Sequence, residues 1–114
     1  MSLERIFKIL ECFGLSHIDT EVYIYISRNG PQQSDNLSRT LKIQKKLLCD
    51  ILRKLEDKGL ITVSLEQTAL FSAIAFEQAL EKLVEANIEQ AMAIKETKEK
   101  LLNKWRSISW QDNV

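Results

Sequence analysis

Hydrophobic residues recur at intervals of three or four over most of this chain, which is the spacing that places them on one face of a helix. The first such segment covers residues 3–13 and stops at Gly14. The second starts after Ser16, where Asp19 completes a capping-box pattern, and it stops at the Gly-Pro pair of residues 30–31. We expect the second helix to bury four apolar side chains: Ile18, Val22, Tyr25 and Ile26.

A short helix, a tight turn and a longer helix follow in close succession. Ser34 is a suitable N-cap for a helix that ends at Leu41, and residues 42–44 leave room only for a tight turn. The longer helix is predicted over residues 45–58. Its apolar residues form a single stripe that we expect to face the core: Leu48, Ile51, Leu52 and Leu55.

Two β-prone segments, residues 60–64 and 70–74, come next and predict a β-hairpin. The hairpin completes a fold class that is mainly α with a small β-hairpin, namely a winged helix-turn-helix with a long C-terminal dimerisation helix. The predicted parts are an amphipathic N-terminal helix (1–14), the winged helix-turn-helix domain (15–75) and the long helix (76–110).

The long helix starts at Phe76 and contains no Gly or Pro for about thirty residues. Its stripe has near-heptad spacing, and Asn87 and Lys98 interrupt it, which suggests that they fix register. No other segment is long enough to cover such a stripe, so the sequence predicts a coiled-coil-like homodimer. The expected interface residues are Phe76, Leu80, Leu83, Asn87, Ala91, Ile94, Leu101 and Trp105.

Charge is distributed unevenly along the chain. The 114 residues are 45% apolar and have a formal net charge of zero, but residues 28–58 carry eight basic side chains against four acidic ones. The positive charge therefore coincides with the predicted helix-turn-helix. In that motif the second helix enters the major groove of double-stranded DNA, where Gln pairs with adenine and Lys or Arg with guanine.

Side chains that avoid the core stripe are the candidate DNA contacts. On the recognition helix we expect base contacts from Gln44, Lys45, Lys46, Cys49 and Arg53. On the preceding helix and turn we expect contacts to the DNA backbone from Ser34, Arg39 and Lys42. The alternative is a winged helix that binds another protein within a transcription assembly; the zero net charge and a hairpin tip without basic residues favour it.

Other function classes have little support in the sequence. A single histidine, His17, and two separated cysteines supply no metal-ligand set, and no phosphate-binding or nucleophile motif is present, so we expect neither an enzyme nor a cofactor. No apolar run approaches the roughly 18 residues of a spanning helix, and the N-terminus does not resemble a signal peptide. We therefore expect a cytoplasmic protein with no membrane partner, in which Cys12 and Cys49 are reduced and buried.

Several ordered motifs resemble one family. They are Phe13-Gly14-Leu15-Ser16, Glu21-Val22-Tyr23, the 30–31 Gly-Pro pair, the 50–53 segment Asp-Ile-Leu-Arg, and Phe76-Glu77-Gln78-Ala79-Leu80. Together they resemble the TrmB family of archaeal winged helix-turn-helix transcriptional regulators, over about residues 13–83. The resemblance implies dimerisation and operator binding.

The sequence also departs from that family. Lys42 stands where the family usually has Gly in the turn, and Leu47 and Cys49 replace an arginine and a tyrosine on the recognition helix. The hairpin tip lacks the family's basic residues. Longer members carry a C-terminal effector domain, whereas this sequence ends at Val114 and corresponds to the DNA-binding part, so no effector ligand is assigned.

Overall fold

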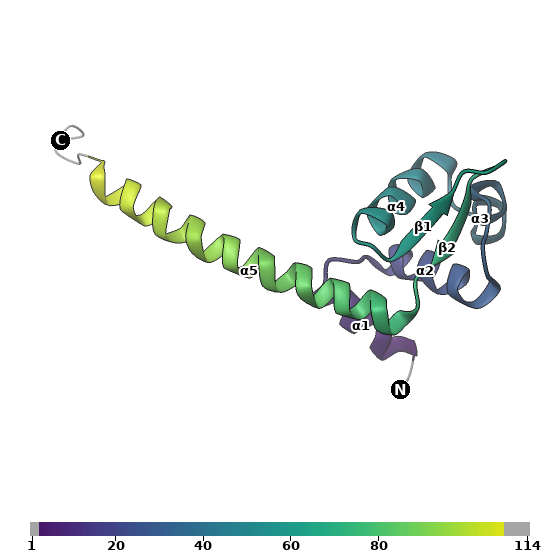
Figure 1. Ribbon diagram of the computed structural model, residues 1–114, viewed down its shortest axis with the longest axis horizontal. Helices are drawn as coiled ribbons and strands as arrows, with labels where there is room; N and C mark the ends of the chain where they lie inside the picture. Colours follow the sequence, from purple (N-terminus) through teal and green to yellow (C-terminus); the bar gives the residue numbers. More distant parts are fainter. Residues whose placement is uncertain (1–2, 109–114) are drawn as a thin grey trace. The chain divides into compact units, whose positions relative to one another are not determined.

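The computed structural model describes residues 3–108, and the chain divides between Leu83 and Val84 into two units (Figure 1). Its elements in chain order are α1 (Leu3–Cys12), α2 (His17–Asn29), α3 (Ser34–Leu41), α4 (Lys45–Asp57), β1 (Ile61–Ser64), β2 (Leu70–Ala73) and α5 (Phe76–Ser107). The fold class expected from the sequence is confirmed: the first unit is a winged helix-turn-helix, and a long C-terminal helix follows the hairpin. Trp110 and the end of the predicted 76–110 segment lie outside the described residues.

The capping box at the start of α2 forms as predicted. The Ser16 hydroxyl accepts a hydrogen bond from the Asp19 amide at 3.2 Å, and the Asp19 carboxylate accepts one from the Ser16 amide at 2.9 Å. These two bonds satisfy amides that have no partner inside the helix. Asp19 is almost fully buried as a result, so this cap is part of the core as well as a helix signal.

The turn between α3 and α4 is closed by the backbone of Lys42, which adopts the left-handed conformation with φ 56° and ψ 47°. The Ile43 amide then bonds the Ser38 carbonyl at 3.1 Å, and the Ser38 hydroxyl donates to the Ile43 carbonyl at 2.7 Å. The expected cap of α3 was wrong by one residue. Gln33 is the N-cap, without a side-chain hydrogen bond, and Ser34 is the first helical residue.

A Schellman motif connects α4 to the hairpin. The Leu60 amide bonds the Leu55 carbonyl and the Gly59 amide bonds the Glu56 carbonyl, both at 2.9 Å. Gly59 has the positive φ of 78° that this motif requires. Leu55 and Leu60 are both buried, which supplies the apolar contact across the helix end.

The sheet is an antiparallel β1–β2 pair with Ile61 opposite Ala73. Gln32, between α2 and α3, adds a short third edge: its amide and carbonyl both bond Phe71, at 3.0 and 2.8 Å. The sequence indicated an extended link at Gln32 but not this pairing. The pairing attaches the segment before the helix-turn-helix to the hairpin.

The core of the first unit contains apolar side chains from α1 to the second turn of α5. Tyr23 is buried there, with 3% exposed, whereas Tyr25 is only half-buried at its edge, which corrects the assignment of Tyr25 to the stripe. The Tyr23 hydroxyl donates a 2.6 Å hydrogen bond to the Ile74 carbonyl, and burial raises the pKa of Tyr23. The two tyrosines flank the same helix face, so only this contact with a residue 51 positions away decides between them.

Both cysteines, Cys12 and Cys49, are free thiols with exposed side chains, which contradicts their expected burial. Each lies beside apolar residues in sequence but on the outer face of its helix. In α5, Ala79 and Leu83 are buried in the first unit, whereas every described residue from 84 onward is exposed.

Candidate nucleic-acid interface

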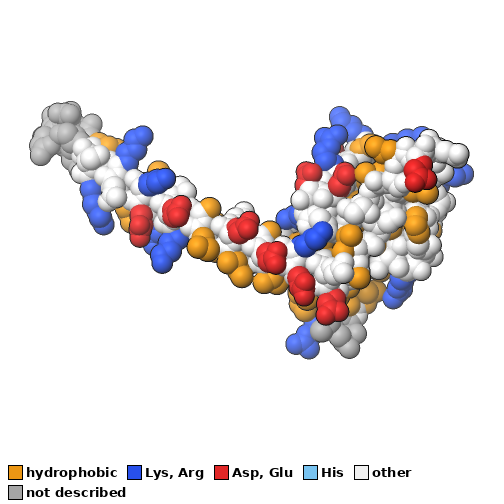
Figure 2. Space-filling view, in the orientation of Figure 1, with side chains coloured by type: hydrophobic (Ala, Val, Ile, Leu, Met, Phe, Trp, Pro, Cys, Tyr) orange, Lys and Arg blue, Asp and Glu red, His pale blue; other side chains and the backbone are white. Residues whose placement is uncertain are grey.

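The outer face of α4 is the leading candidate site. Leu48, Ile51, Leu52 and Leu55 are all buried, as the stripe predicted, and together they fix the rotation of α4 about its axis. Burial of each side chain contributes about 1.5–3 kcal/mol. Opposite this stripe the exposed residues are Lys46, Cys49, Asp50 and Arg53, while Lys45 is exposed beside them in the first turn. Basic side chains are visible along the edge formed by α4 in Figure 2.

A buried ion pair holds α4 against α2. The Lys54 ammonium lies 2.7 Å from the Asp19 carboxylate, whose side chain is only 4% exposed. The same carboxylate caps α2, so one group fixes both the start of α2 and the inner side of α4. Sequence reasoning missed this pair because Asp19 and Lys54 are 35 residues apart and each reads as an ordinary helix-surface residue.

Another ion pair links the two helices of the motif at the surface. Lys45 lies 3.3 Å from Asp35 in the first turn of α3, with 77% and 68% of the two side chains exposed. An exposed pair of this kind contributes about 0–1 kcal/mol. Asp35 therefore competes only weakly with an external anion for Lys45.

Asp50 is a second feature that the sequence analysis omitted. It lies one turn after Lys46 and less than one turn before Arg53, on the same exposed face. A carboxylate here repels phosphate but accepts hydrogen bonds from the exocyclic amine of cytosine. The face thus combines basic donors with one acidic acceptor, a pattern suited to base edges more than to general attraction.

The expected backbone contacts lie on α3 and its turn. Arg39 is exposed in the last turn of α3, and Lys42 is exposed at its C-cap. Ser34 is half-buried in the first turn. Gln44, the N-cap of α4, is exposed and makes no side-chain cap bond. The helix pair therefore places all the candidate residues on α3, α4 and the turn between them.

The hairpin tip carries no basic residue. Residues 65–68 are exposed and include one charge, Glu66, and Leu65 has 76% of its surface exposed. The Thr68 hydroxyl accepts a 3.0 Å hydrogen bond from the Gln33 side chain, which connects the tip to the start of α3. The tip is positioned beside the helix-turn-helix without offering positive charge.

Other kinds of site find no support among residues 3–108. No group of three or more potential metal-ligating side chains occurs there. No helix in that range is both long and apolar enough to cross a membrane.

A helix-turn-helix followed by a β-hairpin, with an exposed basic face on its second helix, defines the winged-helix class of transcriptional regulators. Residues 10–77 match the family model described as sugar-specific transcriptional regulator TrmB. The chain belongs to this family, whose members are transcriptional regulators and not enzymes. No protein with a curated description matches the chain.

Solved structures share the fold at low sequence identity. The transcriptional regulator Tm0710 from Thermotoga maritima has 23% identity, covers 87% of this chain and 77% of its own, and gives a TM-score of 0.57. The ST1889 protein from the archaeon Sulfolobus tokodaii has 20% identity, covers 82% of this chain and 99% of its own, and gives 0.64. MepR of Staphylococcus aureus, solved as a DNA complex, has 18% identity, covers 96% and 76%, and gives 0.54.

Proposed function

We propose that this chain is a cytoplasmic homodimer that binds specific sequences of double-stranded DNA and regulates transcription. The observation that carries the proposal is the face of α4 that presents Lys46, Cys49, Asp50 and Arg53 to solvent while the opposite face is anchored in the core. Family membership and the solved DNA complex of MepR, a protein with the same fold, support it.

In the proposed complex, α4 lies in the major groove and its first two turns meet base edges. Gln44, Lys45 and Lys46 begin the helix, with Cys49 and Arg53 on the turns that follow. Arg39, Lys42 and Ser34 are assigned to phosphates of the DNA backbone, which set register without reading sequence. A two-fold dimer would need half-sites about 10 base pairs apart, or a multiple of that.

The test compares a base contact with a phosphate contact. We expect Lys46→Ala to lose about 1–3 kcal/mol on the preferred duplex and to discriminate less against a scrambled one. We expect Arg39→Ala to weaken both duplexes equally and to lower the salt dependence of binding by about 0.9 log units per phosphate contact. Lys8→Ala, an exposed lysine of α1, is the matched control and should leave binding unchanged.

Selected duplexes from a random library supply the preferred sequence, and binding is measured by titration at several salt concentrations. If Lys46→Ala and Arg39→Ala both bind every duplex as the unmutated chain does, the DNA-binding proposal is wrong.

A protein-contact role is the second candidate, because two large apolar side chains next to this face are exposed. Leu47 on α4 has 45% of its surface exposed, and Leu65 at the hairpin tip has 76%. Exposed apolar residues near one surface favour a protein partner over DNA phosphates. Under this alternative, Leu47→Ser would abolish partner binding and no duplex would show salt-dependent affinity.

A further inference from the structure

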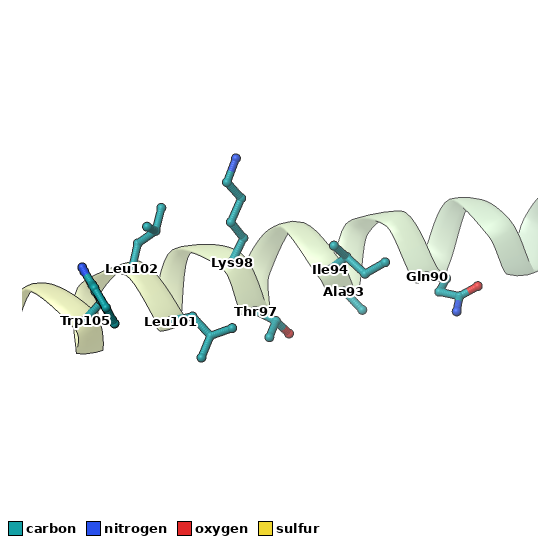
Figure 3. Close-up of a pocket in the computed structure, with 8 residues that line it drawn as sticks. All are labelled: Gln90, Ala93, Ile94, Thr97, Lys98, Leu101, Leu102 and Trp105. Atoms are coloured by element: carbon teal, nitrogen blue, oxygen red, sulfur yellow. The ribbon is translucent and has the colours of Figure 1, made fainter.

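The part of α5 after Leu83 exposes an apolar face. Ile94, Leu101 and Trp105 have 62%, 62% and 58% of their surfaces exposed. Figure 3 shows these residues along successive turns, with Thr97 and Leu101 projecting from one side of the ribbon and Lys98 from the other. A single helix has no facing wall, so these side chains form an open surface and not an enclosed cavity. An apolar stripe of this length on a helix requires a partner.

The stripe becomes a regular heptad once the burial of Leu83 is taken into account. The sequence analysis included Leu83, which forces an irregular step, but Leu83 is only 3% exposed and belongs to the core of the first unit. Val84, which is 41% exposed, takes its place. Two series with a spacing of seven residues then run side by side: Val84, Ala91, Lys98 and Trp105, and Asn87, Ile94, Leu101 and Ile108.

We propose that the occupant of this surface is residues 84–108 of a second copy of the chain, and that the two helices run antiparallel. In the register that uses the whole exposed stripe, each series of one copy faces the other series of its partner. The facing layers are Val84 with Ile108, Asn87 with Trp105, Ala91 with Leu101, and Ile94 with Lys98. This inference rests on the proposed homodimer and adds its orientation and register.

Side-chain volumes favour the antiparallel arrangement. It places the smallest residue of the stripe, Ala91, opposite Leu101, so each layer has similar volume, as close packing requires. It places Asn87 opposite Trp105, whose indole N–H can donate to the Asn87 side-chain oxygen. Lys98 faces Ile94, against which its alkyl stem can pack while the ammonium reaches water.

A parallel pair would face each residue with its own copy. Two Lys98 ammonium groups would then meet in the seam, two Ala91 side chains would leave a thin layer, and two Trp105 rings would crowd another. Like charges in contact destabilise a pair, and both voids and overpacking are unfavourable. The antiparallel register avoids all three, and its one like-charge contact, between the two copies of Lys95, lies at the edge of the seam.

The charges of the segment point the same way. Residues 84–92 carry two glutamates and no basic residue, whereas residues 93–108 carry five basic residues and two acidic ones. Figure 2 shows the basic side chains gathered toward the C-terminal end of the helix. An antiparallel pair sets the acidic part of each copy beside the basic part of the other. These charges lie mostly away from the seam, so the effect weakens beyond a Debye length of about 8 Å in physiological salt.

Cross-linking of the full-length chain tests the orientation. Val84→Cys and Ile108→Cys are made separately, each with Cys12→Ser and Cys49→Ser, and the two variants are co-expressed or expressed alone before treatment with a short bis-maleimide. Identical positions 84 would lie about 36 Å apart in an antiparallel pair, since 24 residues rise about 1.5 Å each. We expect cross-linked dimers only from the co-expressed variants. Cross-linking of either variant alone would overturn the antiparallel orientation.

Sedimentation separates failure of this inference from failure of the proposed function. A dimer that gives no cross-link between positions 84 and 108 contradicts the register but not the homodimer. A monomer at tens of micromolar contradicts both. DNA binding, measured on the same samples, is independent of either result.

A volume exchange provides a second test that needs no cysteine. In the antiparallel register Ala91→Leu crowds Leu101 of the partner twice per dimer, and we expect dimer affinity to fall on the order of tenfold or more. The double variant Ala91→Leu/Leu101→Ala restores the layer volume and should recover most of that loss. A parallel pair predicts the reverse, because Ala91→Leu alone would fill a thin layer and tighten the dimer.

Discussion

The backbone of Lys42 is left-handed, a conformation that is unfavourable for a residue with a Cβ by about 1 kcal/mol. We expect Lys42→Gly to remove this strain and to raise the free energy of unfolding by about 0.5–1 kcal/mol, after allowing for the greater freedom of Gly in the unfolded chain. The same variant should bind DNA more weakly, because it removes a proposed phosphate contact. Denaturant unfolding and duplex titration measure the two effects.

Lys42→Ala is the matched control for this prediction. It removes the charge but keeps the Cβ, so it should weaken DNA binding without the gain in stability. Equal stability of the Gly and Ala variants would contradict the strain argument.

Tyr23 makes stability dependent on pH at the alkaline end. Its neutral hydroxyl donates to the Ile74 carbonyl at 2.6 Å, and burial raises its pKa above the ordinary value of 10.0. As pH rises through 10, the unfolded chain loses this proton first, so the contribution is complete below that pH and declines above it. Tyr23→Phe should be less stable near neutral pH by about 1 kcal/mol and should lose stability less steeply above pH 10. Unfolding curves across that range measure the difference, and Tyr25→Phe is the control.

Single residues also define the limit of what the sequence could predict. Periodicity could not choose between Tyr23 and Tyr25, because the deciding contact is with Ile74. Flanking apolar residues suggested buried thiols, but Cys12 and Cys49 lie on outer helix faces. Ser34 and Gln33 are equally placed before α3, and the helix begins one residue early. In each case tertiary packing or backbone geometry overrides a local preference.

The position of α4 depends on the Asp19–Lys54 pair as well as on its apolar stripe. Removing Lys54 leaves the carboxylate of Asp19, 4% exposed, with only its amide bond, so Lys54→Met should lower the free energy of unfolding by about 1–3 kcal/mol. Lys54 is not on the outer face of α4. We therefore expect a loss of DNA affinity through misplacement of the helix, with the salt dependence unchanged.

A double-mutant cycle checks this coupling. Asp19→Asn/Lys54→Met should be less destabilised than the sum of the two single variants, because it leaves no isolated buried charge. Additive values would mean that the two side chains do not act as a pair. Lys8→Met measures the effect of the substitution at an exposed site.

Whole elements were easier to predict than their contacts. The three- and four-residue spacing, with Gly and Pro at the boundaries, located the helices of the first unit and the long helix to within one or two residues. The hairpin followed from two short apolar segments of the right length. The pairing of Gln32 with Phe71 and the acidic Asp50 on the recognition face had no such signal, since neither disturbs a periodic pattern.

The molecule as a whole has few basic side chains with which to bind DNA. Five per copy lie on α3, α4 and their turn, so a dimer neutralises at most about ten phosphates and the slope of log affinity against log salt should be no steeper than about −9. The recognition-face residues that contact bases instead of phosphates reduce it further. Titrations between low and physiological salt give the slope, and a steeper one would show that residues outside this set contact DNA.

A fragment of residues 1–83 separates folding from assembly. It keeps the buried Ala79 and Leu83, whereas a chain cut after Ile74 exposes the core that they cover. We expect the longer fragment to be folded and monomeric by sedimentation and circular dichroism. Without the second copy, its affinity for a two-site duplex should approach that for a single half-site.

The two buried residues of α5 also give this one helix two sources of stability. Up to Leu83 its turns are held by the core of the same chain, while from Val84 onward a lone helix of this length is marginal in water. The backbone amides before and after that point should therefore exchange with deuterated solvent at different rates. Dilution should speed exchange only in the later turns, so the boundary of protection along α5 would report, residue by residue, how much of the protein is assembled.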